Sequence, residues 1–129
     1  MRILLDTHTF LWWTENSPKL STTAQAAMTN GKNQLFLSVV SAWEIAIKAQ
    51  LGKLAVSGDL SNFITEQIYL NRISVLPIHL QHALEVASLP LLHRDPFDRL
   101  LIAQSRQEQN PDPDTSDPLI SQYEVETLW

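Results

Sequence analysis

Four acidic residues far apart in the chain stand near the boundaries of expected structural elements: Asp6, Glu44, Asp98 and Asp117. If the fold gathers them, three or four carboxylates at one point repel one another unless a divalent cation lies among them. Cys is absent and no convincing His pair accompanies the acids, so the oxygen donors select a hard ion, Mg2+ or Mn2+. Such ions can activate a water and stabilise the charge of an in-line phosphoryl transfer.

Asp6 and Glu44 also have structural interpretations. Asp6 follows a short apolar run and fits the N-cap of the next helix. Ser41 and Glu44 have the spacing of a capping box, and Glu44 can pair with Lys48 four positions later. Taken alone, Glu44 is better explained by structure than by function.

The stretch HRDPFDRLLIAQ, residues 93–104, also allows a structural interpretation of its acids. Asp95 fits an N-cap and Pro96 the first helical position, which places Asp98 where a negative charge meets the positive helix end. Helix capping explains Asp95 fully. It explains Asp98 only weakly, because the longer side chain of a Glu at this position reaches back to the cap better than that of an Asp. Asp117 could be a turn residue before proline.

Composition limits the classes of protein that this chain can be. Its 129 residues allow one domain, 1–129, with a real core, and no apolar run approaches the length of a membrane span. The N-terminal apolar stretch is too short for a signal peptide, which predicts an unexported, cytoplasmic protein. A net charge of -5 excludes nucleic-acid binding through a general basic surface, so cations at the site would have to neutralise a polyanion.

Strand-like and helix-like segments alternate along the chain. Strands are expected at 2–5, 35–38 and 73–76, with a possible edge strand at 124–128. The first helix is expected to run through 10–13 and end near 16–18, and further helices are expected at 21–30, 41–51, 58–68, 81–88 and 95–109. This order predicts an α/β domain with a mostly parallel sheet and helices on both faces. Sites in such sheets lie beyond the carboxyl ends of the strands, where Asp6 is expected.

The motifs LLDTH (4–8), SAWEIAIKAQLGKL (41–54), LPLLHRDPFDRLLIAQ (89–104) and TSDPLISQY (115–123) resemble the PIN-domain ribonuclease toxins of bacterial VapBC toxin–antitoxin pairs. The resemblance runs in order along essentially the whole chain, and DPFDRLLIAQ is its most specific part. It implies a PIN-like three-layer sandwich and a Mg2+- or Mn2+-dependent endoribonuclease acting on structured RNA such as tRNA or rRNA. It also implies a homodimer and a cognate VapB-type antitoxin that blocks the site.

The same resemblance assigns site residues. The four metal-site acids of the family correspond to Asp6, Glu44, Asp98 and Asp117, each expected to serve catalysis as a metal ligand. Thr7 and Ser41 are placed near the metal, and Asp95 is a helix cap close to it. Independently of the resemblance, the positive charges of Lys48 and Arg99 make them candidates either for holding RNA phosphates or for pairing with nearby acids.

One segment departs from the family. Where an apolar strand normally precedes TSDP, this chain has NPDPD at 110–114, which two prolines and two aspartates make a turn or loop. The hypothesis that follows is a site made effectively of Asp6, Glu44 and Asp98, with Asp117 loosely held.

The sequence is also compatible with two other functions. One is a catalytically impaired PIN-like module that binds an antitoxin or RNA without cleaving it. The other is a receiver-like or phosphatase-like α/β domain that uses Asp6 with another acid. The absence of a second early aspartate motif argues against this last alternative.

Overall fold

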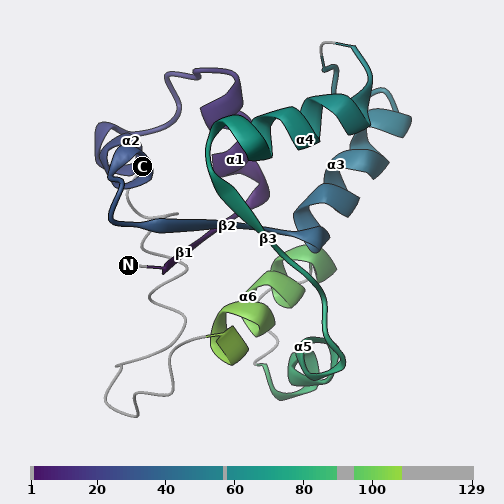
Figure 1. Cartoon of the computed structure of the whole chain (residues 1–129). Coiled ribbons are helices and arrows are strands. Elements are labelled where there is room, and N and C mark those ends of the chain that lie inside the picture. The colour runs from purple at the N-terminus through teal and green to yellow at the C-terminus, as the bar shows by residue number, and fades with distance from the viewer. Residues whose placement is uncertain (1, 57, 90–94, 109–129) are drawn as a thin grey trace.

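Three short parallel strands form the centre of the molecule, and helices connect them (Figure 1). The computed structural model describes residues 2–56, 58–89 and 95–108. Its strands, hydrogen-bonded in the order β1-β2-β3, are β1 (Arg2–Leu5), β2 (Gln34–Ser38) and β3 (Ile73–Leu76). The helices are α1 (Thr7–Thr14), α2 (Thr22–Thr29), α3 (Val39–Gln50), α4 (Leu60–Leu70), α5 (Leu80–Glu85), the 3-10 turn η1 (Val86–Ser88) and α6 (Pro96–Glu108).

One face of the sheet carries the main hydrophobic core. Ile3 and Leu5 of β1 point to the same face as Leu35 and Leu37 of β2, since side chains alternate along a strand. Phe10 of α1 is fully buried here and contributes about 1.5–3 kcal/mol relative to exposure. Partly buried apolar residues of α4 and the loop before it complete the cluster: Leu54, Leu60, Ile64 and Ile68.

The opposite face of the sheet is covered by α6, which runs against the direction of the strands. Gln104 meets Ser38 at the carboxyl end of β2, and Glu108 meets Arg2 at the start of β1. Figure 1 shows α1 and α4 on one side of the strands and α6 on the other. The predicted α/β fold, with a parallel sheet and helices on both faces, is confirmed. The first turn of α6, which bears Asp98, therefore lies toward the carboxyl ends of the strands.

The start of α3 differs from the prediction. The helix begins at Val39 rather than Ser41, and the Ser38 hydroxyl caps it by accepting from the Val40 N–H at 3.0 Å. The predicted capping box of Ser41 with Glu44 is therefore wrong, because the chain passes from strand to helix at Ser38 without a loop. The side chains of Ser41 and Glu44 are thus available for contacts with other elements.

The end of α3 agrees with the prediction. Gly52 adopts a φ of 72°, and its N–H donates to the Ala49 carbonyl at 3.1 Å. A residue with a Cβ atom would be strained in this left-handed conformation, so glycine ends the helix here.

Several expectations concern residues outside the described part of the chain: the NPDPD loop at 110–114, Asp117 and the last strand at 124–128. Among the described residues, none of the helices is long and apolar enough to cross a bilayer.

Candidate functional site

Asp6 is a buried carboxylate at the carboxyl end of β1. Its side chain is 8% exposed, and Oδ1 accepts the Thr9 N–H at 2.7 Å, which makes Asp6 the N-cap of α1. The capping interpretation is confirmed, but it uses only one oxygen. Asp6 Oδ2 accepts no hydrogen bond from any residue that the structure describes. One lone-pair-bearing oxygen at this strand end is therefore available to a ligand.

The side chain of Thr7 links α1 to α3. Its Oγ1 lies 2.7 Å from Glu44 Oε1 and 3.0 Å from Ser41 Oγ, and all three residues are buried. A carboxylate can only accept, so the single Thr7 hydroxyl hydrogen goes to Glu44, and the Ser41 hydroxyl supplies the hydrogen of the other contact. Because Thr7 follows Asp6 directly, these bonds hold Glu44 beside the end of β1.

Lys48 provides a positive charge at this cluster. Its Nζ lies 3.0 Å from Glu44 Oε2, and the Glu44 side chain is only 7% exposed, against 33% for Lys48. The predicted pairing of these two residues is confirmed. A buried carboxylate is costly unless it is paired and hydrogen-bonded, and here Thr7 bonds one oxygen while Lys48 compensates the other. The Glu44 carboxylate thus stabilises a cation at the position of the Lys48 ammonium.

The first turn of α6 carries the second group of acids. Asp95 Oδ1 accepts the N–H groups of Phe97 at 2.8 Å and of Asp98 at 3.3 Å, which confirms Asp95 as the cap. Asp98 lies in this turn and is exposed. The rings of Phe97 and Trp43 meet edge to face with centroids 5.0 Å apart, which brings the start of α6 against α3 one residue from Glu44.

The structure thus brings together some of the predicted site residues and not others. Asp6 and Glu44 share one buried cluster with Thr7 and Ser41, while Asp98 stands on the neighbouring helix. Among the described residues, no group of three or more His, Asp or Glu side chains is arranged to hold a metal ion. Asp117, the remaining predicted ligand, lies outside the described residues.

Arg99 and the tryptophans contact other elements of the fold. Arg99 Nη2 donates to the Val86 carbonyl at 3.0 Å, which ties α6 to η1. Trp12 and Trp13 pack on the main core, and Trp13 Nε1 donates to Asn71 Oδ1 at 2.8 Å. Trp43 is 54% exposed beside Phe97.

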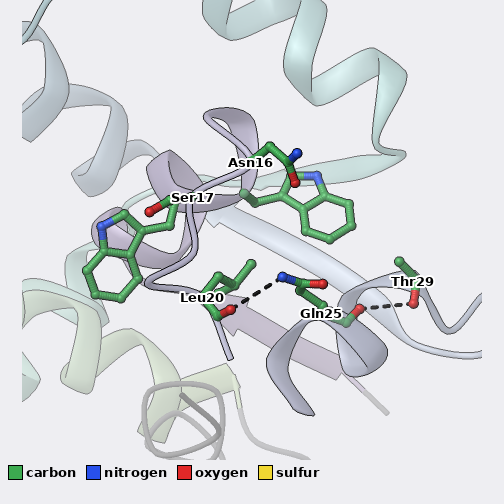
Figure 2. Close-up of a pocket in the computed structure, with 7 residues that line it drawn as sticks. Asn16, Ser17, Leu20, Gln25 and Thr29 are labelled. Atoms are coloured by element: carbon green, nitrogen blue, oxygen red, sulfur yellow. Dashed lines mark hydrogen bonds between the residues drawn. The ribbon is translucent and has the colours of Figure 1, made fainter. Parts of the chain in front are cut away.

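A separate pocket of about 190 Å³ lies between the end of α1, the following loop and α2 (Figure 2). Its lining is Trp12, Trp13, Asn16, Ser17, Leu20, Gln25 and Thr29. The volume of this pocket is below the roughly 300–1,000 Å³ of typical ligand pockets. The pocket adjoins the C-terminal end of α1, whereas Asp6 caps the N-terminal end of that helix. At 1.5 Å per helical residue these two ends are about 10 Å apart. The pocket is therefore separate from the acidic cluster.

Sequence reasoning missed a buried polar group on α6 and α5. Gln104 is 0% exposed and His82 1% exposed, and both make hydrogen bonds to other elements. The signal was present in the sequence: Gln104 stands three positions after Leu101, among the buried residues of the apolar face of α6. A polar side chain on such a face needs partners in the core.

The donor set fits a hard divalent ion. Asp6 and Glu44 offer only oxygen atoms, and the ammonium of Lys48 at Glu44 shows that this cluster accommodates positive charge. Thr7 orients the Glu44 carboxylate, and the Thr9 N–H orients that of Asp6. Asp98 lies on α6, which packs against α3 through the Trp43–Phe97 contact.

Residues 3–111, which are most of the chain, match the PIN domain family. Neither the curated proteins nor the solved structures give a match.

Proposed function

Because this chain belongs to the PIN domain family, whose members are generally metal-dependent nucleases, we propose that it is a Mg2+- or Mn2+-dependent endoribonuclease. The observation that carries the proposal is the buried cluster of Asp6, Thr7, Ser41 and Glu44 at the carboxyl end of β1. Its location is the one where open α/β sheets hold their sites.

Each residue of the cluster has a role in this proposal. Asp6 and Glu44 hold the cation, and Thr7 and Ser41 keep Glu44 oriented toward the end of β1. Asp98, and Asp117 from the last part of the chain, complete the ligand set. When bound, Mg2+ or Mn2+ supplies the charge that attracts the phosphodiester and lowers the pKa of water. A protein of net charge -5 thereby meets a polyanion without a basic surface.

The biological role belongs to the same proposal. The chain is a VapC-type toxin of the cytoplasm that cuts structured RNA, tRNA or rRNA, as a homodimer, and a cognate VapB-type antitoxin neutralises it. The support is the resemblance of LLDTH, SAWEI and DPFDRLLIAQ to such toxins, together with the family membership. Lys48 is the described cation nearest to Glu44, where an RNA phosphate would compete for it.

A second candidate is a PIN-like module that binds an antitoxin or RNA without cleaving it. It is favoured by the arrangement of the described acids, in which Asp98 is exposed and forms no three-ligand group with Asp6 and Glu44. Metal-independent binding without cleavage would support this function over the first.

The test is cleavage-site mapping on total RNA with wild type and Asp6→Asn, with Mg2+, with Mn2+ and with chelator. Asn is as good an N-cap as Asp, so this variant keeps α1 capped and removes only the charge. The matched control is Asp59→Asn, since Asp59 caps α4 in the same way, accepting from the Asn62 N–H at 3.1 Å.

We expect metal-stimulated cuts with wild type and Asp59→Asn, and a loss of more than about 100-fold with Asp6→Asn, as when one electrostatic contact to a transition state is removed. Equal cutting by wild type and Asp6→Asn would point to a contaminating nuclease and contradict the proposal.

A further inference from the structure

A buried hydrogen bond joins α6 to the residue that caps α3. The Ser38 hydroxyl donates to Gln104 Oε1, and both residues are 0% exposed. The two residues are 66 positions apart in the sequence. Ser38 is also the N-cap of α3, the helix that carries Ser41 and Glu44. Gln104 lies on α6, the helix that carries Asp98.

The orientation of the Gln104 amide follows from its neighbours. Its Nε2 lies 3.2 Å from the carbonyl oxygen of Pro77, which can only accept, so Nε2 must face Pro77 and Oε1 must face Ser38. The amide therefore bridges the ends of two strands, since Ser38 ends β2 and Pro77 follows β3. One side chain of α6 thus sets the position of this helix on both strand ends.

His82 and Glu108 extend the same network. His82 Nδ1 accepts the His79 N–H at 2.9 Å, so the ring hydrogen is on Nε2, which donates to Glu108 Oε1 at 2.8 Å. Gln104 Nε2 approaches His82 Nδ1 at 3.5 Å. A fully satisfied buried network of this kind specifies one arrangement of the elements that it joins.

The alignment of α3 and α6 places the two acids. The Ser38–Gln104 bond and the Trp43–Phe97 contact, taken together, set the helices side by side in opposite directions. Glu44 and Asp98 each lie six positions from the bond, or about 9 Å along their helices. A small rotation about the bond therefore moves the carboxylates relative to each other, and a misplacement of about 1 Å can cost about 100-fold in rate.

We infer that Ser38 and Gln104 are positioning residues for the divalent-ion site, an inference that rests on the proposed function. They touch neither substrate nor ion. They fix the separation between the α3 half of the site, with Glu44, and the α6 half, with Asp98. An apolar pair of the same size would pack as well but would leave this separation unspecified.

The test measures Mn2+ affinity by calorimetry in Gln104→Met, which preserves side-chain length and helix propensity and leaves the Ser38 cap of α3 in place. The matched control is Gln107→Met on the same helix, where Gln107 is exposed and donates to Glu85 at 3.0 Å. Met28→Ala, a buried residue of α2, is the control for lost stability. Melting temperatures are recorded for all variants.

A second readout does not depend on metal. Because the chain contains no Cys, nitroxide labels on single cysteines at exposed Ala46 of α3 and Gln107 of α6 report the separation of these helices by pulsed EPR. We expect a narrow distance distribution in the otherwise wild-type protein and in the Met28→Ala background. We expect a broader or shifted distribution with Gln104→Met.

The inference predicts that Gln104→Met weakens Mn2+ binding about tenfold, as for other residues that orient metal ligands, with cleavage reduced in parallel. Ser38→Ala breaks the same bond from the α3 side and serves if Gln104→Met does not fold. Unchanged Mn2+ affinity in a folded variant would overturn the inference. The proposed function would still stand if the wild type cleaves RNA. An equal loss in Met28→Ala would also overturn the inference. A wild type that neither binds Mn2+ nor cleaves would refute the proposed function, and this inference with it.

Discussion

The two acid-bearing regions of this protein are built in opposite ways. At the end of β1, Asp6 and Glu44 are 8% and 5% exposed, and bonds from α1 and α3 hold them. At the start of α6, Asp95 and Asp98 are exposed, and the main bonds of Asp95 are to its own helix end. A buried carboxylate requires tertiary partners, whereas the exposed Asp95 is held by capping its own helix.

The difference suggests a division of work within the proposed site. The β1 side is preformed, because the Thr7 hydroxyl and the Lys48 ammonium hold Glu44 before any ligand arrives, and the Thr9 N–H holds Asp6. The α6 side reaches it through the Trp43–Phe97 contact and the buried Gln104 bond. Breaking each side separately shows how far they act as one site.

The largest expected effect is on cleavage. Glu44→Gln and Asp98→Asn should each lower metal-dependent RNA cleavage by about 100-fold or more, since each removes one charge that the transition state requires. Initial rates of cleavage of a mapped RNA fragment measure this, with Glu66→Gln on the exposed face of α4 as the control. A loss with Glu44→Gln alone would exclude Asp98 from the site and confine the site to the β1 side and residues beyond α6.

The next effect is on stability and concerns the β1 side only. Thr7→Val keeps the shape of the side chain and removes the hydroxyl that donates to Glu44 Oε1 at 2.7 Å. We expect the free energy of unfolding to fall by about 1–3 kcal/mol, because a buried acceptor is left without its donor. Urea denaturation measures it. Thr65→Val, at an exposed threonine of α4, should change it little, and equal losses would contradict the claim that burial makes the difference.

On the α6 side the expected stability effect is smaller. Asp95→Ala removes the cap of α6 and should cost about 1 kcal/mol, while Asp98→Asn should stay within about 0.5 kcal/mol of wild type. Thermal unfolding of both variants tests this. If Asp98→Asn were the more destabilising of the two, the acid would serve the fold rather than the site.

The smallest effect links charge to metal. Lys48→Met removes the cation at Glu44 and should lower metal-free stability by up to about 1 kcal/mol, discounted because Lys48 is one-third exposed. Added Mg2+ should remove this deficit in stability, since an ion that binds only the folded protein stabilises it. Melting curves with and without Mg2+ measure this, with exposed Lys53→Met as the control. A deficit that Mg2+ does not reduce would contradict a shared cation position.

Local chemistry made parts of the fold predictable. Asp95 before Pro96 marks a helix start, Gly52 a helix end and Asp6 a strand-to-helix junction, and each follows from the backbone needs of a few adjacent residues. The cap of α3 was not predicted correctly, because Ser41 with Glu44 satisfies the local pattern as well as Ser38 does. Contacts with other elements distinguish the two, since Ser38 bonds Gln104 of α6 and Glu44 bonds Thr7 of α1.

The sequence by itself determined the alternation of strands and helices, the helix caps on α1 and α6, and the oxygen-rich chemistry of the acids, because these depend on residue type and short spacing. The tertiary structure alone decided that Thr7 bonds Glu44 and that Gln104 joins α6 to Ser38. These contacts join positions 37 and 66 residues apart. Hydrogen bonds across such separations form only when packing of the core has brought both partners out of water together.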